Sequence, residues 1–538
     1  MKSKTFSLSN SILVFIIILI LVILYLPLFF FLAKASSIND FFSISTIINL
    51  LADSWYRSII FFTLKQALIS TVLTVVFGFP LAWIVSRYSF IGKSLIKSIF
   101  LVPFILPSII IAMGFILFYG NQGYLNQVLT VFGFKLRILY SFKAILMAHI
   151  LYNLPIVIRL VGNTLENFNT HLENIASSLG ANNYLRLTNL YLPCLCPSIL
   201  SSSLLIFLYC FMTFGIVLVL GDVSLTTLEV NIYILIQRLF NFPAGMALAF
   251  IQMIITLLIL FLVSIAEKKN KIFQSLITEP SGVNANKHPI GRLRFIYVIV
   301  MLFYVLAPLI AIMIDFFHDL GNSEKNFSLL IYNPIISANI IQVIGNSILV
   351  GLLTASITIT FATAMALGIH TIPKLSLTGM IAMLPMGISP ITFGIGFIFI
   401  KQYLGYSSFL LLIVGHVIIS FPLVYKIIFD GIKQVRKDLI NTARSLGAGN
   451  FQIIKYVLLP LSKKYLLTGF IFSFALSLGE LGIAVVLQRN FITIPVAIYR
   501  FLSARQYIPA TGMSIVLMVT ALLCFYVFEK MFEGKRSI

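Results

Sequence analysis

One stretch occurs twice in this chain, and its spacing constrains the whole fold. The first copy reads Leu172-Glu-Asn-Ile-Ala-Ser-Ser-Leu-Gly180 and continues to Leu192-Pro193. The second reads Leu439-Ile-Asn-Thr-Ala-Arg-Ser-Leu-Gly447 and continues to Leu459-Pro460. Gly447 follows Gly180 by 267 residues, and Pro460 follows Pro193 by the same number. Four further pairs share this offset: His149 and His416, Pro155 and Pro422, Arg159 and Lys426, and Gly215 and Gly482. The sequence therefore predicts an internal duplication.

Each copy has the pattern of a short helix that ends at a glycine. Apolar or small residues recur at i, i+3, i+4 and i+7, which is typical of one helix face. These residues are Leu172, Ile175, Ala176 and Leu179 in the first copy and Leu439, Thr442, Ala443 and Leu446 in the second. Gly180 and Gly447 stand where a left-handed residue would end each helix. We expect Thr170 and Glu173 to form a capping box, and Asp438 to cap the second helix.

The composition indicates a polytopic membrane protein. Of 538 residues, 60% are hydrophobic and only 10% are charged, and the mean hydropathy is +1.05. Soluble domains are about 25% charged. The net charge of +21 does not point to nucleic acid, because Lys and Arg gather in short loops that the positive-inside rule places in the cytoplasm. We expect the lipid bilayer as the surroundings, no nucleic-acid partner, and no disulfide among the four cysteines.

Twelve apolar segments are long enough to span a membrane, six in each half. They lie near residues 11–31, 58–86, 96–118, 142–162, 196–221, 241–266, 293–314, 342–370, 376–400, 408–430, 463–488 and 509–528. The first is long for a signal peptide, although Ala33-Lys34-Ala35 resembles a cleavage site, so retention and cleavage both stay open. The predicted fold is all-α, with twelve transmembrane helices in two parallel six-helix repeats.

The distribution of charge predicts the orientation. Four basic segments, Arg87–Lys97, Lys268–Arg294, Lys433–Lys464 and Lys530–Arg536, are separated by even numbers of spans. We therefore place them in the cytoplasm, together with both termini and both copies of the repeated stretch. The connections near 222–240 and 489–508 belong to the external face. Acids concentrate in the external connections: Asp40, Asp53, Asp222, Glu229, Asp315, Asp319 and Glu324.

The repeat also predicts how the chain is divided. Pro103 and Gly114 pair with Pro385 and Gly396 at an offset of 282, so the first half carries extra residues after its third span. We expect a first helix with an external loop (1–57), a first repeat (58–266), a cytoplasmic linker (267–292), a seventh helix with its loop (293–341), a second repeat (342–530) and a basic tail (531–538).

The sequence holds no pattern of an enzyme. Gly92-Lys93-Ser94 resembles the end of a phosphate-binding loop, but that pattern needs a glycine where Arg87 stands. Six histidines form no metal-binding pair of the HExxH kind. We expect no catalytic residue, no cofactor and no metal site, and any ATP hydrolysis to occur on a separate chain.

Ionisable residues inside predicted spans are candidates for function. His149 and His416 are expected to be polar core residues that form hydrogen bonds between helices. Glu480 lies beside Gly482 in the eleventh predicted span, and its counterpart in the first half is Thr213. Two interpretations of Glu480 stay open. It is a cation contact or gate in a pathway together with Gly482, or it makes a structural hydrogen bond.

The repeated stretch resembles the E-A-A-x-x-x-G loop of type I ABC importer permeases, which a Leu-Pro pair follows. The family's glutamate position is Asn174 and Asn441 here, and its first alanine is Ile175 and Thr442. Both copies retain the second alanine, the glycine and Leu-Pro. In that family the loop docks onto a cytoplasmic ATPase. The resemblance thus implies an ATPase-coupling role for Glu173, Ala176, Gly180, Pro193, Ala443, Gly447 and Pro460.

Two six-span halves in one chain resemble the fused permeases of thiamine and ferric-iron importers. Three stretches are more similar to the thiamine branch: Tyr119–Tyr124, Thr226–Tyr233 and Gly479–Gly482. The resemblance implies an inner-membrane permease of a bacterium, a homodimeric ABC ATPase, and a periplasmic or lipid-anchored substrate-binding protein. It implies thiamine or its phosphates as substrate, with ferric iron as the alternative. A more distant alternative is a secondary transporter with twelve spans, for which Glu480 is the one candidate coupling group.

Overall fold

The protein is almost entirely helical in the residues that its computed structural model describes. These are residues 2–37, 44–222, 224–277, 288–322, 332–333, 335, 338–372, 375–487 and 491–533. Two short strand pairs occur there: β1 (Tyr88–Ser89) runs parallel to β2 (His288–Pro289), and β3 (Tyr332–Asn333) runs antiparallel to β4 (Ala338–Asn339). The predicted all-α class is confirmed.

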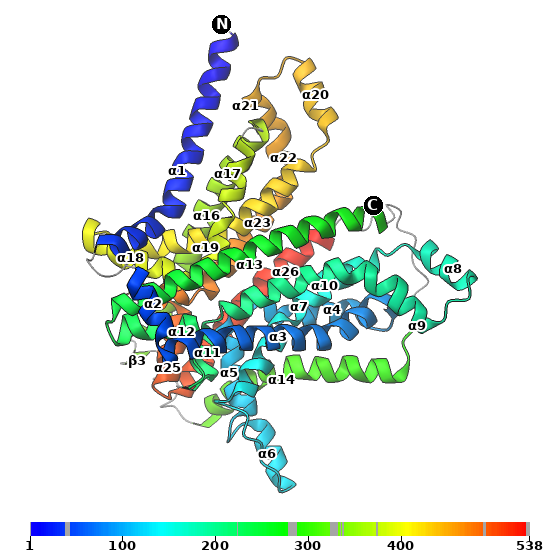
Figure 1. The fold of residues 1–538 in the computed structure, drawn as a ribbon, viewed down its shortest axis with the longest axis vertical. Coiled ribbons are helices and arrows are strands. Elements are labelled where there is room, and N and C mark those ends of the chain that lie inside the picture. The colour runs from blue at the N-terminus through cyan, green and yellow to red at the C-terminus, as the bar shows by residue number, and fades with distance from the viewer. Residues whose placement is uncertain are drawn as a thin grey trace. The chain divides into compact units, whose positions relative to one another are not determined.

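The helices differ widely in length (Figure 1). In the first half they are α1 (Lys2–Ser37), α2 (Ile44–Ala52), α3 (Ser54–Arg87), α4 (Lys93–Ile105), α5 (Ser108–Tyr119), α6 (Tyr124–Val131), α7 (Phe142–Glu166), α8 (Thr170–Ser178), α9 (Asn183–Arg186), η1 (Leu187–Tyr191), α10 (Leu192–Phe211), α11 (Gly215–Leu220), α12 (Leu228–Tyr233), η2 (Ile234–Arg238) and α13 (Phe242–Ile277). In the second half they are α14 (Arg292–Asn322), α16 (Ile340–Thr371), α17 (Ser376–Ile381), η4 (Leu384–Gly387), α18 (Pro390–Leu404), α19 (Ser408–Lys433), α20 (Lys437–Ser445), α21 (Asn450–Ile453), η5 (Ile454–Leu458), α22 (Leu459–Leu461), α23 (Lys463–Gly479), α24 (Gly482–Leu487), α25 (Ile494–Ser503) and α26 (Tyr507–Glu533).

The number of candidate membrane helices agrees with the prediction. By length and composition, ten helices of the described chain can cross a membrane, and two bent pairs raise the number to twelve. One pair, Leu377–Gly387 and Pro390–Leu404, bends by 97°. The other, Asn450–Leu461 and Lys463–Gly479, bends by 68°.

Four predicted spans are interrupted where the prediction made them continuous. One is the span predicted at 376–400, which divides into α17, η4 and α18. The span predicted at 96–118 divides into α4 and α5 at Pro107, which has no N–H to continue the helix. The span predicted at 196–221 divides between α10 and α11. The span predicted at 463–488 divides at Glu480, between α23 and α24.

Some predicted loops are also helical. α13 continues to Ile277, so the first part of the predicted linker is helix. The external connections near 222–240 and 489–508 hold α12, η2 and α25. Glu229, predicted as an external acid, is fully buried and accepts a hydrogen bond from Gln252 Nε2. Asp40, Glu324, the linker residues 278–287 and the tail residues 534–538 lie outside the described residues.

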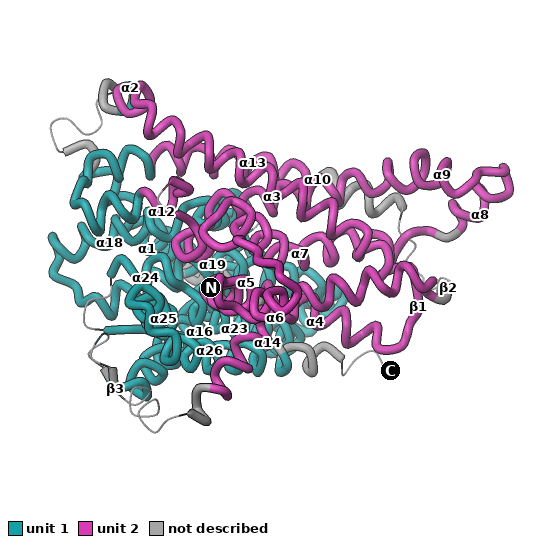
Figure 2. Tube along the Cα trace, turned by 90° about the horizontal axis from the view of Figure 1, so that it is seen from below, with its two compact units in different colours: residues 1–48, 232–249, 322–538 teal, residues 49–231, 250–321 magenta. Residues whose placement is uncertain are grey.

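The chain divides into two compact units (Figure 2). Unit 2 comprises residues 49–231 and 250–321, and α3, α7 and α10 pack together at its centre. α14 packs in the same unit, where Tyr297 Oη donates a hydrogen bond to the Phe77 carbonyl at 2.7 Å. A Cβ on Gly114 would lie 2.6 Å from the carbonyl oxygen of Pro308 in α14, so this glycine permits close contact between the two backbones.

Unit 1 comprises residues 1–48, 232–249 and 322–538 and repeats that design. α16, α19 and α23 pack together, and α1 lies against α16 and α18. A Cβ on Gly396 would lie 2.1 Å from the carbonyl oxygen of Pro27 in α1. The duplicated glycines, Gly114 and Gly396, thus serve the same purpose. In each unit the glycine contacts a proline-containing helix that precedes the other repeat in sequence.

Cysteine labelling tests the predicted orientation. Ser178 and Ser445 are exposed equivalents in the two repeated stretches, and Asp222 is exposed in a predicted external connection. In a background without the four native cysteines, we expect a membrane-impermeant maleimide to label Asp222→Cys in intact cells. Ser178→Cys and Ser445→Cys should react only after permeabilisation. Labelling of either serine position from outside would contradict the orientation.

Candidate functional site

The first repeated stretch folds as a short helix with a defined stop. α8 is followed by Gly180, whose φ is +77°. The Gly180 N–H donates to the Ser177 carbonyl, and the Ala181 N–H donates to the Ala176 carbonyl, both at 3.0 Å. This pair of hydrogen bonds is a Schellman motif, which requires a left-handed residue and so favours glycine.

The second stretch repeats this geometry in unit 1. α20 is followed by Gly447 with φ +85°. The Gly447 N–H donates to Arg444 at 2.9 Å, and the Ala448 N–H donates to Ala443 at 3.0 Å. The predicted left-handed glycines are therefore confirmed in both copies. The duplicated alanine supplies the carbonyl that closes each motif.

The predicted helix caps are wrong in both copies. Asn169 caps α8, because its side chain accepts a hydrogen bond from the His171 N–H at 2.8 Å. α20 starts after Arg436 without a side-chain cap, and Asp438 instead lies 3.3 Å from the Arg436 guanidinium. Glu173 turns away from its own helix end and pairs with Arg87.

Arg87 holds the first loop against the end of α3. Its guanidinium pairs with Glu173 and donates to Tyr191 Oη at 2.6 Å. It also lies over the rings of Trp83 and Tyr191, at 6.0 and 5.2 Å. The Arg87 and Glu173 side chains are only 16% and 19% exposed. This anchor was missed by the prediction, which used Arg87 to assign orientation and to rule out a phosphate-binding loop.

The second loop is anchored without charge. Ile440 occupies the position equivalent to Glu173 and is buried. The residue one place before the family's glutamate position thus faces the body of the protein in both units. An ion pair holds one loop, and an apolar side chain holds the other.

Apolar side chains at the C-terminal ends of both short helices point into solvent. Leu179 is 81% exposed and its counterpart Leu446 is 83% exposed. Figure 1 shows α8 and α20 projecting from the helices that precede them. The prediction placed the alanine and the leucine of each copy on one helix face. In the structure Ala176 and Ala443 are half-buried, whereas Leu179 and Leu446 are exposed. Exposed leucines beside a rigid turn suit insertion into a partner's cleft.

The chain leaves each loop through a π-helical turn. η1 and η5 lie 267 residues apart, and Leu192-Pro193 and Leu459-Pro460 follow them directly. Proline cannot donate the usual i→i−4 hydrogen bond and its ring clashes with that carbonyl. A widened turn accommodates this defect. The retained Leu-Pro pair therefore marks the return from the loop into α10 and α22.

Removing the Arg87 anchor should weaken the first loop. We expect Arg87→Ala to release Glu173 and cost about 1.5–3 kcal/mol locally, the range for hydrogen bonds to charged groups. Proteolysis of the loop between α7 and α10 should accelerate, while the equivalent loop between α19 and α23 stays protected. Lys97→Ala, which breaks the exposed pair with Glu166, is the matched control. Equal proteolysis in Arg87→Ala and the wild type would contradict this role.

Each of the two intramembrane histidines lies close to two polar side chains, and the residues near Nε2, Thr213 and Glu480, are at equivalent positions. In unit 2, His149 Nδ1 lies 3.0 Å from Ser70 Oγ, and Nε2 lies 3.1 Å from Thr213 Oγ1. In unit 1, His416 Nδ1 lies 2.7 Å from Ser477 Oγ, and Nε2 lies 3.2 Å from Glu480 Oε2. The predicted hydrogen bonds between helices are confirmed.

Glu480 lies at a helix break rather than inside a continuous span. Its carboxylate accepts hydrogen bonds from the N–H groups of Ile483 and Ala484, at 2.9 and 3.1 Å, and so caps α24. The side chain is 7% exposed. A Cβ on Gly482 would lie 2.9 Å from Pro390 and 3.2 Å from the Glu480 carboxylate. This geometry supports the structural interpretation of Glu480, which the sequence left open.

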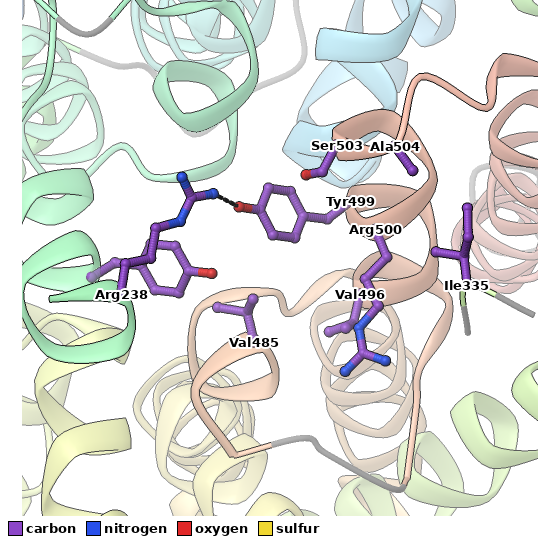
Figure 3. A pocket seen from close by; sticks show the side chains of 9 residues that line it. Arg238, Ile335, Val485, Val496, Tyr499, Arg500, Ser503 and Ala504 are labelled. Atoms are coloured by element: carbon purple, nitrogen blue, oxygen red, sulfur yellow. Dashed lines mark hydrogen bonds between the residues drawn. The ribbon is translucent and has the colours of Figure 1, made fainter. Parts of the chain in front are cut away.

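A further site is a cavity of about 490 Å³ in unit 1 (Figure 3). Tyr233, Arg238, Tyr499 and Arg500 are among the residues that line it. The rings of Tyr233 and Tyr499 meet edge to face, with centroids 6.5 Å apart. Sequence reasoning missed this site. A signal existed, because Thr227-Leu-Glu-Val-Asn-Ile-Tyr233 recurs as Thr493-Ile-Pro-Val-Ala-Ile-Tyr499.

Comparison with known proteins identifies similar chains. Residues 364–537 match the family "Binding-protein-dependent transport system inner membrane component". A probable sulfate transport system permease protein of Prototheca wickerhamii is 32% identical over 209 residues, which are 38% of this chain and 81% of that protein.

Two relatives that align with most of this chain carry the same name. The thiamine transport system permease protein of Haemophilus influenzae is 24% identical, over 88% of this chain and 89% of the relative. The protein of the same name in Escherichia coli is 23% identical, over 89% of this chain and 90% of the relative.

Proposed function

Because the chain belongs to the family of binding-protein-dependent inner membrane transport components, and is a two-repeat ABC importer permease, we propose that it carries thiamine or a thiamine phosphate. The support is the extent of the similarity. Relatives named as thiamine permeases align with almost the whole chain and leave little of themselves unmatched. The sulfate permease aligns with 38% of this chain.

The proposed mechanism needs a motor on another polypeptide. The two short helices, each with a Schellman motif and an exposed leucine, are the surfaces that we assign to a homodimeric cytoplasmic ATPase. A duplicated contact on the permease matches a motor with two equal subunits. The proposed coupling residues are Glu173, Ala176, Gly180 and Pro193 in the first loop and Ala443, Gly447 and Pro460 in the second.

These residues divide into three roles. Gly180 and Gly447 set the left-handed stop, and the alanine carbonyls close it. Glu173 anchors the first loop through Arg87. Pro193 and Pro460 set the π-helical return. None of these roles requires the residue itself to contact ATP. We assign to these residues the role of holding Leu179 and Leu446 rigidly in place.

The other proposed partner is a periplasmic or lipid-anchored binding protein, and the proposed location is the bacterial inner membrane. The binding protein would deliver substrate to the external face. We also propose that Glu480 and Gly482 form a gate, in addition to the structural hydrogen bonds of Glu480, because a carboxylate that caps a helix break couples the position of α24 to that of His416.

Stimulation of ATP hydrolysis distinguishes the substrates. We expect the permease–ATPase complex in nanodiscs to hydrolyse ATP faster when its binding protein is loaded with thiamine than when it is empty. Chelated ferric iron serves as the competing cargo. Stimulation by iron-loaded protein and not by thiamine-loaded protein would overturn the substrate assignment and favour the ferric-iron alternative.

A further inference from the structure

The cavity in unit 1 has a chemistry that the proposed function does not by itself explain. We propose that it is an anion-binding subsite, in which Arg238 and Arg500 hold the phosphate ester group of an aromatic substrate. The identification of this ligand as the transported substrate rests on the proposed function. Binding of the ligand can be tested without transport.

The charge of the lining is the first support. Nine residues line the cavity, and the charged ones are two arginines, with no Asp or Glu among the nine. The guanidinium group presents a rigid fork of donors that matches phosphate oxygens, and it stays charged at all physiological pH values. A cation without an anionic group would be repelled from such a lining.

Arg238 is held in place by neutral groups. Its Nη2 donates a hydrogen bond to Tyr499 Oη at 2.9 Å, as Figure 3 shows. Burial raises the pKa of the Tyr233 hydroxyl, so this neighbour also stays neutral. The two tyrosines therefore orient the guanidinium without neutralising its charge. The position of Arg238 follows from the π-helical turn η2, of which it is the last residue. Phe240, two residues later, has a φ of +53°.

Arg500 approaches the cavity from α25, one residue after Tyr499. Burial lowers the pKa of the Arg500 guanidinium. This direction shows that its charged form loses hydration, which costs free energy. An anion in the cavity would interact favourably with the guanidinium groups of both Arg500 and Arg238.

The tyrosines suggest the rest of the ligand. Tyr233 and Tyr499 present perpendicular aromatic rings at the cavity wall, and aromatic rings of a ligand pack well in edge-to-face or offset contacts. The volume of about 490 Å³ falls within the range of about 300–1,000 Å³ for small-molecule sites. The ligand class is a phosphate or diphosphate ester that carries an aromatic ring.

The position of the cavity suits the delivery of substrate. Its lining residues Tyr233, Arg238, Tyr499 and Arg500 belong to the connections that charge places on the external face. Free thiamine carries a fixed positive charge and lacks an anionic group, so it should bind this lining poorly. Thiamine diphosphate has both the aromatic rings and the anion. The site therefore favours the phosphorylated form.

Direct binding tests the proposal. The full-length permease is reconstituted in phosphatidylcholine nanodiscs and titrated with inorganic diphosphate, thiamine diphosphate and free thiamine. We expect the wild type to bind both diphosphates more tightly than thiamine. Arg238→Gln and Arg500→Gln should each weaken diphosphate binding about tenfold or more, the loss expected for a charge-assisted contact. Arg500→Lys should give an intermediate loss, because it keeps the charge without the fork.

Arg505→Gln is the matched control, since this arginine lies close in sequence to Arg500 but does not line the cavity. It should bind like the wild type. Wild-type affinity in the double variant Arg238→Gln/Arg500→Gln would overturn the proposal, as would no diphosphate binding to the wild type. Thiamine uptake that persists in either case would leave the proposed function standing.

An anionic lipid headgroup shares the phosphate chemistry, and a second arm distinguishes it. The titration is repeated in nanodiscs that contain phosphatidylglycerol. Unchanged diphosphate affinity supports a solute site. Loss of diphosphate binding there, with phosphatidylglycerol retained by the wild type and not by the double variant, would overturn the assignment of the anion to the substrate.

Discussion

Substitution of Gly447 by valine should leave the permease in the membrane but reduce ATPase association and uptake by at least about tenfold. Gly447 has φ +85°, and no atom lies within 4 Å of the place where its Cβ would be. The cost therefore comes from the backbone, at roughly 1–2 kcal/mol for a left-handed residue, which is about a tenfold change in an equilibrium. Loss of the Schellman turn would also move Leu446. Co-purification with the ATPase measures the effect.

Two control variants separate docking from folding. Gly449 lies two residues after Gly447 and has a φ of −71°, which valine tolerates. The Gly449→Val permease should therefore couple normally to the ATPase. Gly92→Val imposes the same backbone strain at φ +77° outside both repeated loops, so it should lower stability without lowering ATPase association. Gly180→Val should resemble Gly447→Val. Normal uptake at normal expression in both Gly180→Val and Gly447→Val would remove the docking assignment.

Loss of the Glu480 carboxylate should have the second-largest effect. Glu480→Ala leaves the buried N–H groups of Ile483 and Ala484 without acceptors and removes the carboxylate that lies 3.2 Å from His416 Nε2. Each buried unsatisfied group costs about 1–3 kcal/mol, so the break between α23 and α24 should lose about 3 kcal/mol or more. Glu480→Gln keeps one acceptor oxygen but no charge, and should slow uptake while ATPase docking persists.

The first half offers a control for this experiment. Thr213→Val removes the equivalent neutral contact to His149, which should cost about 1 kcal/mol. Thermal unfolding of the detergent-solubilised variants gives the stabilities, and initial uptake rates at matched expression give the function. Wild-type rate and stability in Glu480→Gln would show that the charge at this break has no role in either.

The periodic features of the fold were predictable from the sequence. Long apolar segments, the offset of 267 residues and the two helix-ending glycines depend on composition and local geometry, and the structure confirms each. The interruptions were not predictable from hydropathy, because a break such as the one at Glu480 lies within an apolar segment. Pro107 and Pro390 were local signals at two of the breaks, and a proline alone does not distinguish a kink from a stop.

Contacts between distant residues were the other limit. Arg87 and Glu173 are neighbours only after α3 and α7 have packed, and nothing in their spacing predicts the pair. The same holds for His416 and Glu480, which were considered separately although their counterparts His149 and Thr213 share the offset. A duplicated chain lets such pairs be sought, because a contact in one half predicts its equivalent in the other.

The two halves differ where the candidate sites lie. Glu173 corresponds to Ile440, and Thr213 corresponds to Glu480. When Tyr233 is aligned with Tyr499, Arg238 corresponds to Ala504. The equivalent backbone geometry is nonetheless kept, as the two Schellman motifs show. We infer that the duplicated backbone carries the coupling and that the unlike side chains supply one asymmetric route for substrate.

Uptake into sealed vesicles tests the central claim most directly. The vesicles hold the permease with its ATPase, contain ATP inside, and receive the binding protein and labelled thiamine or thiamine diphosphate outside. The account predicts uptake that requires ATP, the ATPase and the binding protein together, and that persists when ion gradients are collapsed. Uptake that an ion gradient drives without ATP would contradict it.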